Sequence, residues 1–281
     1  MSGKLVVVGT PIGNLGDMSA RAVQALEAAD FIAAEDTRVT VKLLNHFGVK
    51  KPMMSYFEHN KQQKGEYIVA RILAGETCAL VSDAGMPAIS DPGEDLVAQC
   101  HANGIEVTVI PGPCAFVSAL AISGLPTGRF TFEGFLSVNK KSRFAHLDAI
   151  KKEPRTMVFY EAPHKLLRTL RDLFEALGDR RISIVRELTK IHEEVLLTTL
   201  QGAVEKYEST PPKGEFVLAV EGYKEALAPA DAGVSVEAAV ETARALLGKG
   251  CAISDAAKQA AKATGLKKSD IYKGLLKGEN K

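Results

Sequence analysis

Short apolar runs alternate with amphipathic stretches along the first half of the chain. Four runs of small and β-branched residues predict buried strands, and between them apolar residues recur with the period of a helix. The predicted strands are residues 5–8, 31–34, 77–82 and 107–110, and the predicted helices are residues 20–29, 64–73 and 94–102. Because alternating strands and helices form βαβ units, we predict an N-terminal α/β domain with a largely parallel sheet over residues 1–122.

The pattern changes at residues 123–126, whose sequence Ser-Gly-Leu-Pro is typical of a turn. Beyond it, strands follow one another with fewer helices between them, which favours a mixed or antiparallel sheet. The predicted strands are residues 130–136, 156–160, 182–186, 193–199 and 215–221, and the predicted helix is residues 165–177, ended by Gly178. We therefore expect a second α/β domain with a mixed sheet over residues 123–225.

The last part of the chain has a different character. Residues 226–235 are rich in alanine, proline and glycine and predict a linker, and three short helices are predicted at residues 236–247, 255–264 and 269–276. Glycine-containing turns join these helices, as in a small helix-turn-helix bundle. We expect a linker and a helical module over residues 226–281.

Charge is balanced over the whole chain but not along it. There are 35 Lys and Arg residues against 34 Asp and Glu residues, yet residues 249–281 hold eight lysines against three acidic residues. The C-terminal end therefore carries +5 and residues 1–248 carry −4. A basic helical module favours contacts with RNA phosphates.

The four cysteines are scattered, without metal-ligand spacing. This pattern indicates reduced thiols in a cytoplasmic protein, with neither a zinc site nor a disulfide framework. The N-terminal apolar run is too short for a signal peptide or a membrane span. We therefore expect no metal and no membrane association.

Each of the first four predicted strands runs into a polar or glycine- and proline-rich loop. The loops read GTPIGNLGD, EDTR, DAGMPAISDPG and PGPCA. Ligands bind beyond the carboxyl ends of parallel strands, so these loops should converge on one cleft. GTPIGNLGD matches neither the dinucleotide pattern nor the phosphate-loop pattern, which favours a nucleoside-type ligand over a triphosphate. A plain strand-to-helix connection is the alternative for this loop.

These loops, followed by LPTGRFTFEGFL, FYEAPHK, RELTK and KGEFVLAVEG, closely resemble the ribosomal RNA small subunit methyltransferase I family from about residue 5 to residue 222. That family belongs to the tetrapyrrole methylase-like group. The resemblance implies a class III S-adenosylmethionine methyltransferase fold, with the cofactor cleft between two α/β domains and a small C-terminal helical bundle. It also implies S-adenosyl-L-methionine as cofactor and a cytoplasmic homodimer. The implied reaction methylates the ribose 2′-hydroxyl of a cytidine in the decoding centre of 16S rRNA, in the small ribosomal subunit.

The resemblance further implies cofactor contacts in the first, third and fourth loops, at the end of the strand at residues 156–160, and before the last strand. The implied contacts are Pro11, Ile12, Asp83, Gly85, Met86, Pro87, Cys114, Ala115, Tyr160, Glu161, Lys213, Gly214 and Glu215. In-line methyl transfer depends on positioning and exclusion of water, which a cleft of backbone amides, small residues and carboxylates provides.

On the acceptor side, a ribose hydroxyl becomes more nucleophilic when a neighbouring group accepts its proton. Candidate catalytic residues near predicted strand ends are Glu35, Asp36, Arg38, His59, Glu133 and Glu187, with Asp83 and Glu161 as further carboxylates. The sequence leaves open which of them, if any, is the base. For Glu35 and Asp36 the alternative is an ion pair with Arg38 or a helix cap, and for His59 it is a surface loop.

Basic residues supply the expected RNA contacts, because arginine binds phosphate in a bidentate manner and lysine acts as a point charge. Candidate RNA-binding residues are Arg186, Lys190, Lys140, Lys141, Lys267 and Lys268. Lys140, Lys141 and Arg143 are expected in the loop after Phe135, where a simple solvated face is the alternative.

Rival functions remain. An NAD(P)-dependent oxidoreductase fits the glycine spacing and Glu35, but Lys165 is one place too far from Tyr160 for the Y-x-x-x-K proton relay. A porphyrinoid methylase of the same fold would share the cofactor cleft. The lysine-rich tail and the sequences of the first two loops argue against this function. A non-catalytic RNA-binding protein would not need the cofactor loops.

Overall fold

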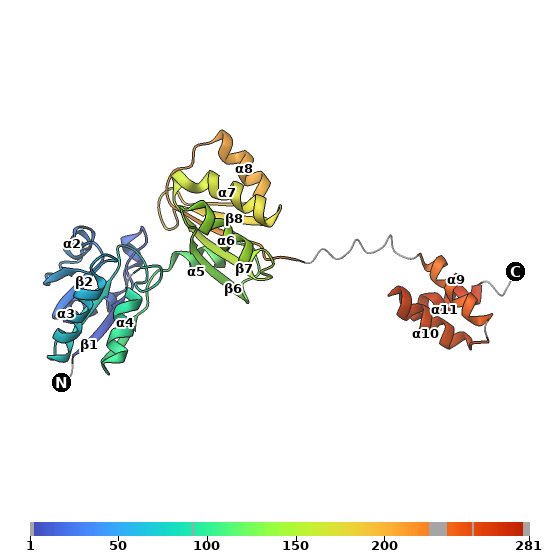
Figure 1. The fold of residues 1–281 in the computed structure, drawn as a ribbon, viewed down its shortest axis with the longest axis horizontal. Coiled ribbons are helices and arrows are strands. Elements are labelled where there is room, and N and C mark those ends of the chain that lie inside the picture. Colours follow the sequence, from blue (N-terminus) through green and yellow to red (C-terminus); the bar gives the residue numbers. More distant parts are fainter. Residues whose placement is uncertain (1–2, 92, 225–234, 249, 278–281) are drawn as a thin grey trace. The chain divides into compact units, whose positions relative to one another are not determined.

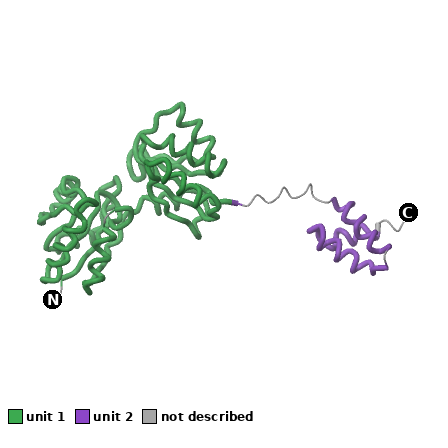
Figure 2. The backbone as a smooth tube through the Cα atoms, in the orientation of Figure 1, with its two compact units in different colours: residues 1–223 green, residues 224–281 purple. Residues whose placement is uncertain are grey.

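The computed structural model describes residues 3–91, 93–224, 235–248 and 250–277. Contacts divide the chain into two compact units, residues 1–223 and residues 224–281 (Figure 2). The first unit contains both sheets, and the second contains the C-terminal helices (Figure 1). The predicted boundary between residues 225 and 226 lies two residues after this division.

The first sheet has five parallel strands in the order β3-β2-β4-β1-β5. Its strands are β1 (Lys4–Val8), β2 (Phe31–Ala34), β3 (Met53–Ser55), β4 (Cys78–Val81) and β5 (Glu106–Ile110). Core residues of α1 (Ala20–Ala28) and α2 (Thr37–His46) pack on one face. Those of α3 (Lys61–Leu73) and α4 (Gly93–Ala102) pack on the other. The predicted parallel sheet is confirmed.

Neither the helix α2 nor the strand β3 was predicted from the sequence. The helix α2 begins inside the segment EDTR, where the side chain of Asp36 accepts the backbone N–H of Arg38 and caps the first turn. The strand β3 lies at the sheet edge and has three half-buried residues, so it lacks the apolar run of its neighbours.

The second sheet is mixed and has the order β6-β7-β10-β8-β9. Its strands are β6 (Phe130–Phe135), β7 (Thr156–Glu161), β8 (Arg181–Arg186), β9 (Glu194–Thr199) and β10 (Phe216–Val220). The pair β6–β7 is parallel and the other pairs are antiparallel, as expected for the second domain. Helices α6 (Lys140–Ile150), α7 (Pro163–Leu177) and α8 (Leu200–Ser209) contribute core residues to one face.

The opposite face of the second sheet packs against α5 (Ala115–Ile122), whose Ala119 and Leu120 contact Val158, Val185 and Val217. No helix was predicted here from the sequence, and the predicted boundary at residue 122 placed these residues in the first domain. By its packing, α5 belongs to the second sheet, so the chain crosses from one sheet to the other immediately after β5.

The prediction of a basic loop after Phe135 was wrong. Lys140 and Lys141 are exposed residues in the first turn of α6, which Asn139 caps. Arg143 is buried, and its Nε donates to Asp172 Oδ2 on α7 at 2.6 Å. Arg143 therefore stabilises the packing of α6 on α7 and is not available to RNA.

In the C-terminal unit, the three predicted helices are confirmed as α9 (Val236–Leu247), α10 (Ile253–Thr264) and α11 (Lys268–Lys277). They pack around a small core rich in alanine, together with Ile271 and Leu275. Of the predicted linker, residues 226–234 lie outside the described residues, and Ser235 caps α9 by accepting the N–H of Ala238. None of the helices described in the structure is both long and apolar enough to cross a bilayer.

Candidate active site

A cavity of about 610 Å³ opens where the carboxyl ends of the first sheet meet the second sheet. One wall consists of residues from the loops after β1, β2, β4 and β5. The other wall comes from β6, β7, β8, β10 and the start of α7. The expected convergence of the four strand-end loops on one cleft is therefore confirmed.

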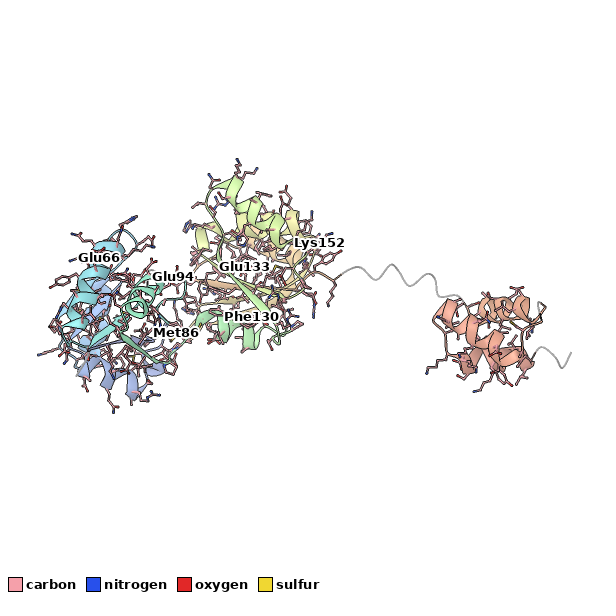
Figure 3. All side chains as sticks on the ribbon, turned by 60° about the horizontal axis from the view of Figure 1, so that its bottom comes forward. Glu66, Met86, Glu94, Phe130, Glu133 and Lys152 are labelled. Atoms are coloured by element: carbon pink, nitrogen blue, oxygen red, sulfur yellow. The ribbon has the colours of Figure 1, made fainter. Side chains whose placement is uncertain are left out.

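Close backbone contacts lock three of these loops together. A Cβ atom on Gly112 would lie 2.8 Å from the Cα of Gly9, so neither position has room for a side chain. Thr10 and Gly85 exchange backbone hydrogen bonds of 2.9 and 3.1 Å. The sulfur of Met86, labelled in Figure 3, accepts the N–H of Gly112 at 3.3 Å. Gly9 of the first loop and Gly112 of the fourth loop thus allow these loops to pack closely together.

The loop after β4 is strained. Ala88 and Ser90 adopt positive φ angles of 66° and 64°, which side chains other than glycine rarely occupy. The carboxylate of Asp91 stabilises this shape by accepting the N–H groups of Ala88 at 2.7 Å and Gly93 at 3.0 Å. Strain of this kind is typical of loops that position a ligand.

Three carboxylates make the first wall acidic. The side chain of Glu35 accepts the N–H of Asp83 at 3.3 Å, and the side chain of Asp83 accepts the N–H of Asp36 at 3.0 Å. Burial raises the pKa values of Glu35, Asp83 and Asp91, since low-dielectric surroundings disfavour the ionised form. A cationic ligand in the cavity would lower the free-energy cost of ionising these carboxylates.

The second wall is mostly apolar and aromatic. The rings of Phe135 and Tyr160 lie 5.5 Å apart, and burial raises the pKa of Tyr160 to about 12. The hydroxyl of Tyr160 accepts the N–H of Phe116 in the first turn of α5 at 3.3 Å. Glu161 is buried and accepts the N–H of Ala162 at 2.8 Å and the hydroxyl of Thr169. This wall offers a flat apolar surface beside a few fixed polar atoms.

Most of the predicted cofactor contacts come together in this cavity. Those that line it are Ile12, Asp83, Gly85, Met86, Cys114, Ala115, Tyr160, Glu161 and Glu215. Pro11, Pro87, Lys213 and Gly214 are not among the lining residues, although each adjoins or lies within two positions of one.

Of the predicted catalytic residues, Glu35 lines the cavity. Asp36 and Arg38 form an ion pair with a closest distance of 2.5 Å, in which the Arg38 side chain is 88% exposed. Hydrogen bonds from Arg38 lower the pKa of Asp36 to about 2. The alternative of an ion pair and helix cap is thus confirmed for Asp36.

His59, Glu133 and Glu187 are not among the cavity-lining residues. The ring of His59 contacts Phe57 edge-on between β3 and α3. Glu133, labelled on β6 in Figure 3, forms a 2.8 Å hydrogen bond with His146 of α6. Glu187 accepts the N–H of Glu215 at 2.9 Å and the ammonium of Lys190 at 3.0 Å.

Lys190 is held at the rim of the cavity. Its ammonium also donates to Glu215 at 2.8 Å, so it bridges two carboxylates. Its side chain lies against Gly13 of the first loop, where a Cβ would come within 2.6 Å of the Lys190 Cγ. Glu187 and Thr189 have positive φ angles of 50° and 67°. We call residues 187–190, with Glu215 and Gly13, the clasp.

Several lining residues were not predicted from the sequence. They are Ser82, Ala84, Ile89, Ser90, Asp91, Phe135, Ala162, Pro163, Val185, Leu188, Phe216 and Val217. Ala84, Ile89, Ser90 and Asp91 lie in the third loop and Ser82 directly precedes it, so the convergence of the loops could have identified these five residues. The others carry no chemical signal in the sequence, because their position depends on which face of the second sheet they occupy. Among the described residues, no cluster of three metal-ligating side chains occurs.

The sequence model of the tetrapyrrole (corrin/porphyrin) methylases matches residues 4–204. Ribosomal RNA small subunit methyltransferase I of Synechocystis sp. is 47% identical over 99% of both chains. The protein of that name from Escherichia coli O157:H7 is 45% identical over 98% of this chain and 95% of its own length. The chain belongs to the ribosomal RNA small subunit methyltransferase I family.

Solved structures place this family in the tetrapyrrole methylase fold. Diphthine synthase has a TM-score of 0.57 at 13% identity, covering 78% of this chain and 90% of its own. Uroporphyrin-III C-methyltransferase from Thermus thermophilus, complexed with S-adenosylhomocysteine, has a TM-score of 0.56 at 16% identity, covering 78% of this chain and 97% of its own. At such identities the likeness shows the fold alone, and it confirms the predicted fold class.

Proposed function

We propose that this protein transfers a methyl group from S-adenosyl-L-methionine to the ribosomal RNA of the small subunit. Family membership supports the reaction class and the substrate. The observation that carries the proposal is the cavity, because its two walls match the two halves of this cofactor.

The residues fit the cofactor in size and in chemistry. A cavity of about 610 Å³ is within the range of roughly 300–1,000 Å³ usual for small-ligand sites. Glu35, Asp83 and Asp91 on the first wall suit the cationic end, and Phe135 and Tyr160 on the second wall offer packing for the adenosine. When bound, S-adenosylmethionine supplies an electrophilic methyl group on a positively charged sulfur.

The finer target that we propose is the ribose 2′-hydroxyl of a cytidine in the decoding centre of 16S rRNA. This assignment rests on the resemblance of the eight sequence blocks. We propose Glu35 as the group that accepts the hydroxyl proton, because it combines a place in the cavity with a raised pKa. The loops then orient the acceptor and exclude water.

Incubation of the protein with labelled S-adenosylmethionine and unmodified small subunits tests the proposal. Nuclease digestion and mass analysis should place the label on one cytidine ribose. Label on a base would refute the 2′-hydroxyl assignment. Label on an added porphyrinoid but not on RNA would instead favour a porphyrinoid methylase, the function named for several proteins of this fold.

We also propose a cytoplasmic homodimer whose C-terminal helices contact rRNA phosphates, with Lys267 in the turn after α10 and Lys268 as the first residue of α11. Light scattering that gives the mass of a single chain would contradict the dimer. Deleting residues 236–281 should weaken subunit binding and reduce its salt dependence; unchanged affinity would contradict the role of the helices.

A further inference from the structure

A second cavity, of about 350 Å³, lies at the end of β8. It is lined by Arg186 at the end of β8, Glu194 at the start of β9, Lys206 and Tyr207 on α8, and residues 210–213 before β10. We call it the basic pocket. Of its residues, Arg186 and Lys213 entered the sequence predictions, as an RNA contact and a cofactor contact, and the others did not.

Cations outnumber carboxylates in the basic pocket. Arg186, Lys206 and Lys213 line it together with one carboxylate, that of Glu194, which gives the lining a net charge of +2. Glu194 accepts from Lys206 at 2.7 Å and from Arg186 Nη1 at 3.4 Å. Lys213 has no ion-pair partner among residues 3–91, 93–224, 235–248 and 250–277. The pocket therefore retains unneutralised positive charge for an anion.

The pocket is also preformed. Arg186 Nε donates to the carbonyl of Lys213 at 2.6 Å, which ties the strand to the loop. Pro211 and Pro212 restrict that loop, since each proline ring fixes its own φ angle. Burial raises the pKa of Tyr207 to about 12, so its hydroxyl stays protonated and able to donate. Fixed donors lose little conformational entropy when they bind.

The basic pocket adjoins the cofactor cavity through two segments. Val185 lines the cavity while the next residue, Arg186, lines the pocket, because successive strand residues point to opposite faces. In the loop before β10, Lys213 lines the pocket and Glu215, two residues later, lines the cavity. An RNA strand that presents one nucleotide to the cavity would pass this pocket with a neighbouring part of its backbone.

We propose that the basic pocket binds a backbone phosphate of the RNA, close to the nucleotide that is methylated. The inference rests on the proposed function, and it names the residues that hold the substrate in register. Lys190 is less suited to this role, because Glu187 and Glu215 already neutralise its charge.

Lys206→Gln in the full-length protein tests the pocket. Binding to unmodified small subunits should weaken about tenfold, since a charge-assisted contact is worth roughly 1.5 kcal/mol or more. The slope of log affinity against log salt should fall by about 0.7–0.9, the amount expected for one lost phosphate contact. KM for subunits should rise, with kcat and the affinity for S-adenosylmethionine unchanged.

Arg171→Gln is the matched control. Arg171 forms a comparable ion pair with Glu208 at 2.8 Å between α7 and α8, and it is not among the residues that line the pocket. Its binding constant and salt slope should equal those of the wild type. The inference is wrong if Lys206→Gln leaves both quantities unchanged, or if the two variants lose affinity equally.

Glu194→Gln supplies a readout of opposite sign. Removing the negative charge while keeping a hydrogen-bond acceptor should tighten subunit binding and steepen its salt dependence. Weaker binding would overturn the phosphate assignment. If binding depends on Lys206 but no methyl group reaches any RNA, the proposed function fails and the pocket stands. If methyl transfer to RNA occurs but does not depend on Lys206, the proposed function stands and the assignment of the pocket fails.

Discussion

The cofactor cavity and the basic pocket occupy opposite faces of the same strand, β8, yet their electrostatics are opposite. In the cavity, burial raises the pKa values of Glu35, Asp83 and Asp91. In the pocket, Lys206 lowers the pKa of Glu194. The alternation of side chains along one strand is enough to separate a site suited to a cation from a site suited to an anion.

The two sites also differ in how they are assembled. The cavity needs loops from along the whole first sheet, held together by backbone contacts such as that between Gly9 and Gly112. The basic pocket draws on the contiguous stretch from Arg186 to Lys213. Damage to the loops should therefore abolish one site and spare the other.

The largest expected effect comes from Gly112→Val, which breaks the cavity. The new side chain has no room against the backbone of Gly9, so the loops after β1 and β5 must separate. Calorimetry should show cofactor affinity reduced at least 100-fold, while subunit binding through the basic pocket is retained. The control is Gly128→Val, because a Cβ at that position would meet no atom within 4 Å. Retained cofactor binding in Gly112→Val would show that the close packing of Gly9 on Gly112 is not needed to form the cavity.

Glu35→Gln should lower kcat by about 100-fold, the lower limit usual for loss of a general base. Subunit binding should not change, because the substitution lies outside the basic pocket. A kcat within threefold of the wild type would rule out Glu35 as the base.

The same variant should unfold at a higher temperature at pH 7. The folded-state pKa of Glu35 is raised by burial, so the ionised carboxylate destabilises the folded protein above that pKa. The advantage of glutamine should disappear as the pH falls below the unfolded value of 4.5, where both states are protonated. Thermal melts from pH 4 to pH 8 measure the difference in melting temperature between the variant and the wild type. A difference that does not change with pH would show that ionisation of Glu35 is not its cause.

Lys190→Met should have the smallest effect, and it should affect both sites. Loss of the ammonium leaves the half-buried Glu187 with one fewer donor, at a cost of roughly 1 kcal/mol in unfolding free energy. KM should rise a few-fold for the cofactor and for subunits, because Glu215 of the clasp lines the cavity and Glu187 directly follows Arg186 of the basic pocket. Lys152→Met, at an exposed lysine of the second sheet's lobe (Figure 3), is the control and should match the wild type.

The first sheet and its half of the cavity were largely predictable. Continuous apolar runs marked β1, β2 and β4, and the rule that ligands bind at the carboxyl ends of parallel strands indicated the loops. What could not be predicted was the short edge strand β3, which has no such run.

The second wall was not predictable, because it depends on register. The pairing of β6 with β7 shifts between Phe132 and Gly134. As a result Phe135 lines the cavity, whereas Glu133, two residues earlier, hydrogen-bonds His146 on α6. Without the irregularity the two side chains would share a face. The residue pattern of β6 gives no sign of this register shift, and Glu133 was therefore proposed as a catalytic residue.

The single crossing of the chain between the two sheets, at the start of α5, has a mechanical consequence. If the two sheets with their helices were pulled apart, only one covalent connection would resist. A ligand that contacts both walls of the cavity would add a second, non-covalent connection. S-adenosylmethionine should therefore raise the force needed to separate the lobes in a single-molecule pulling experiment, and not only the melting temperature.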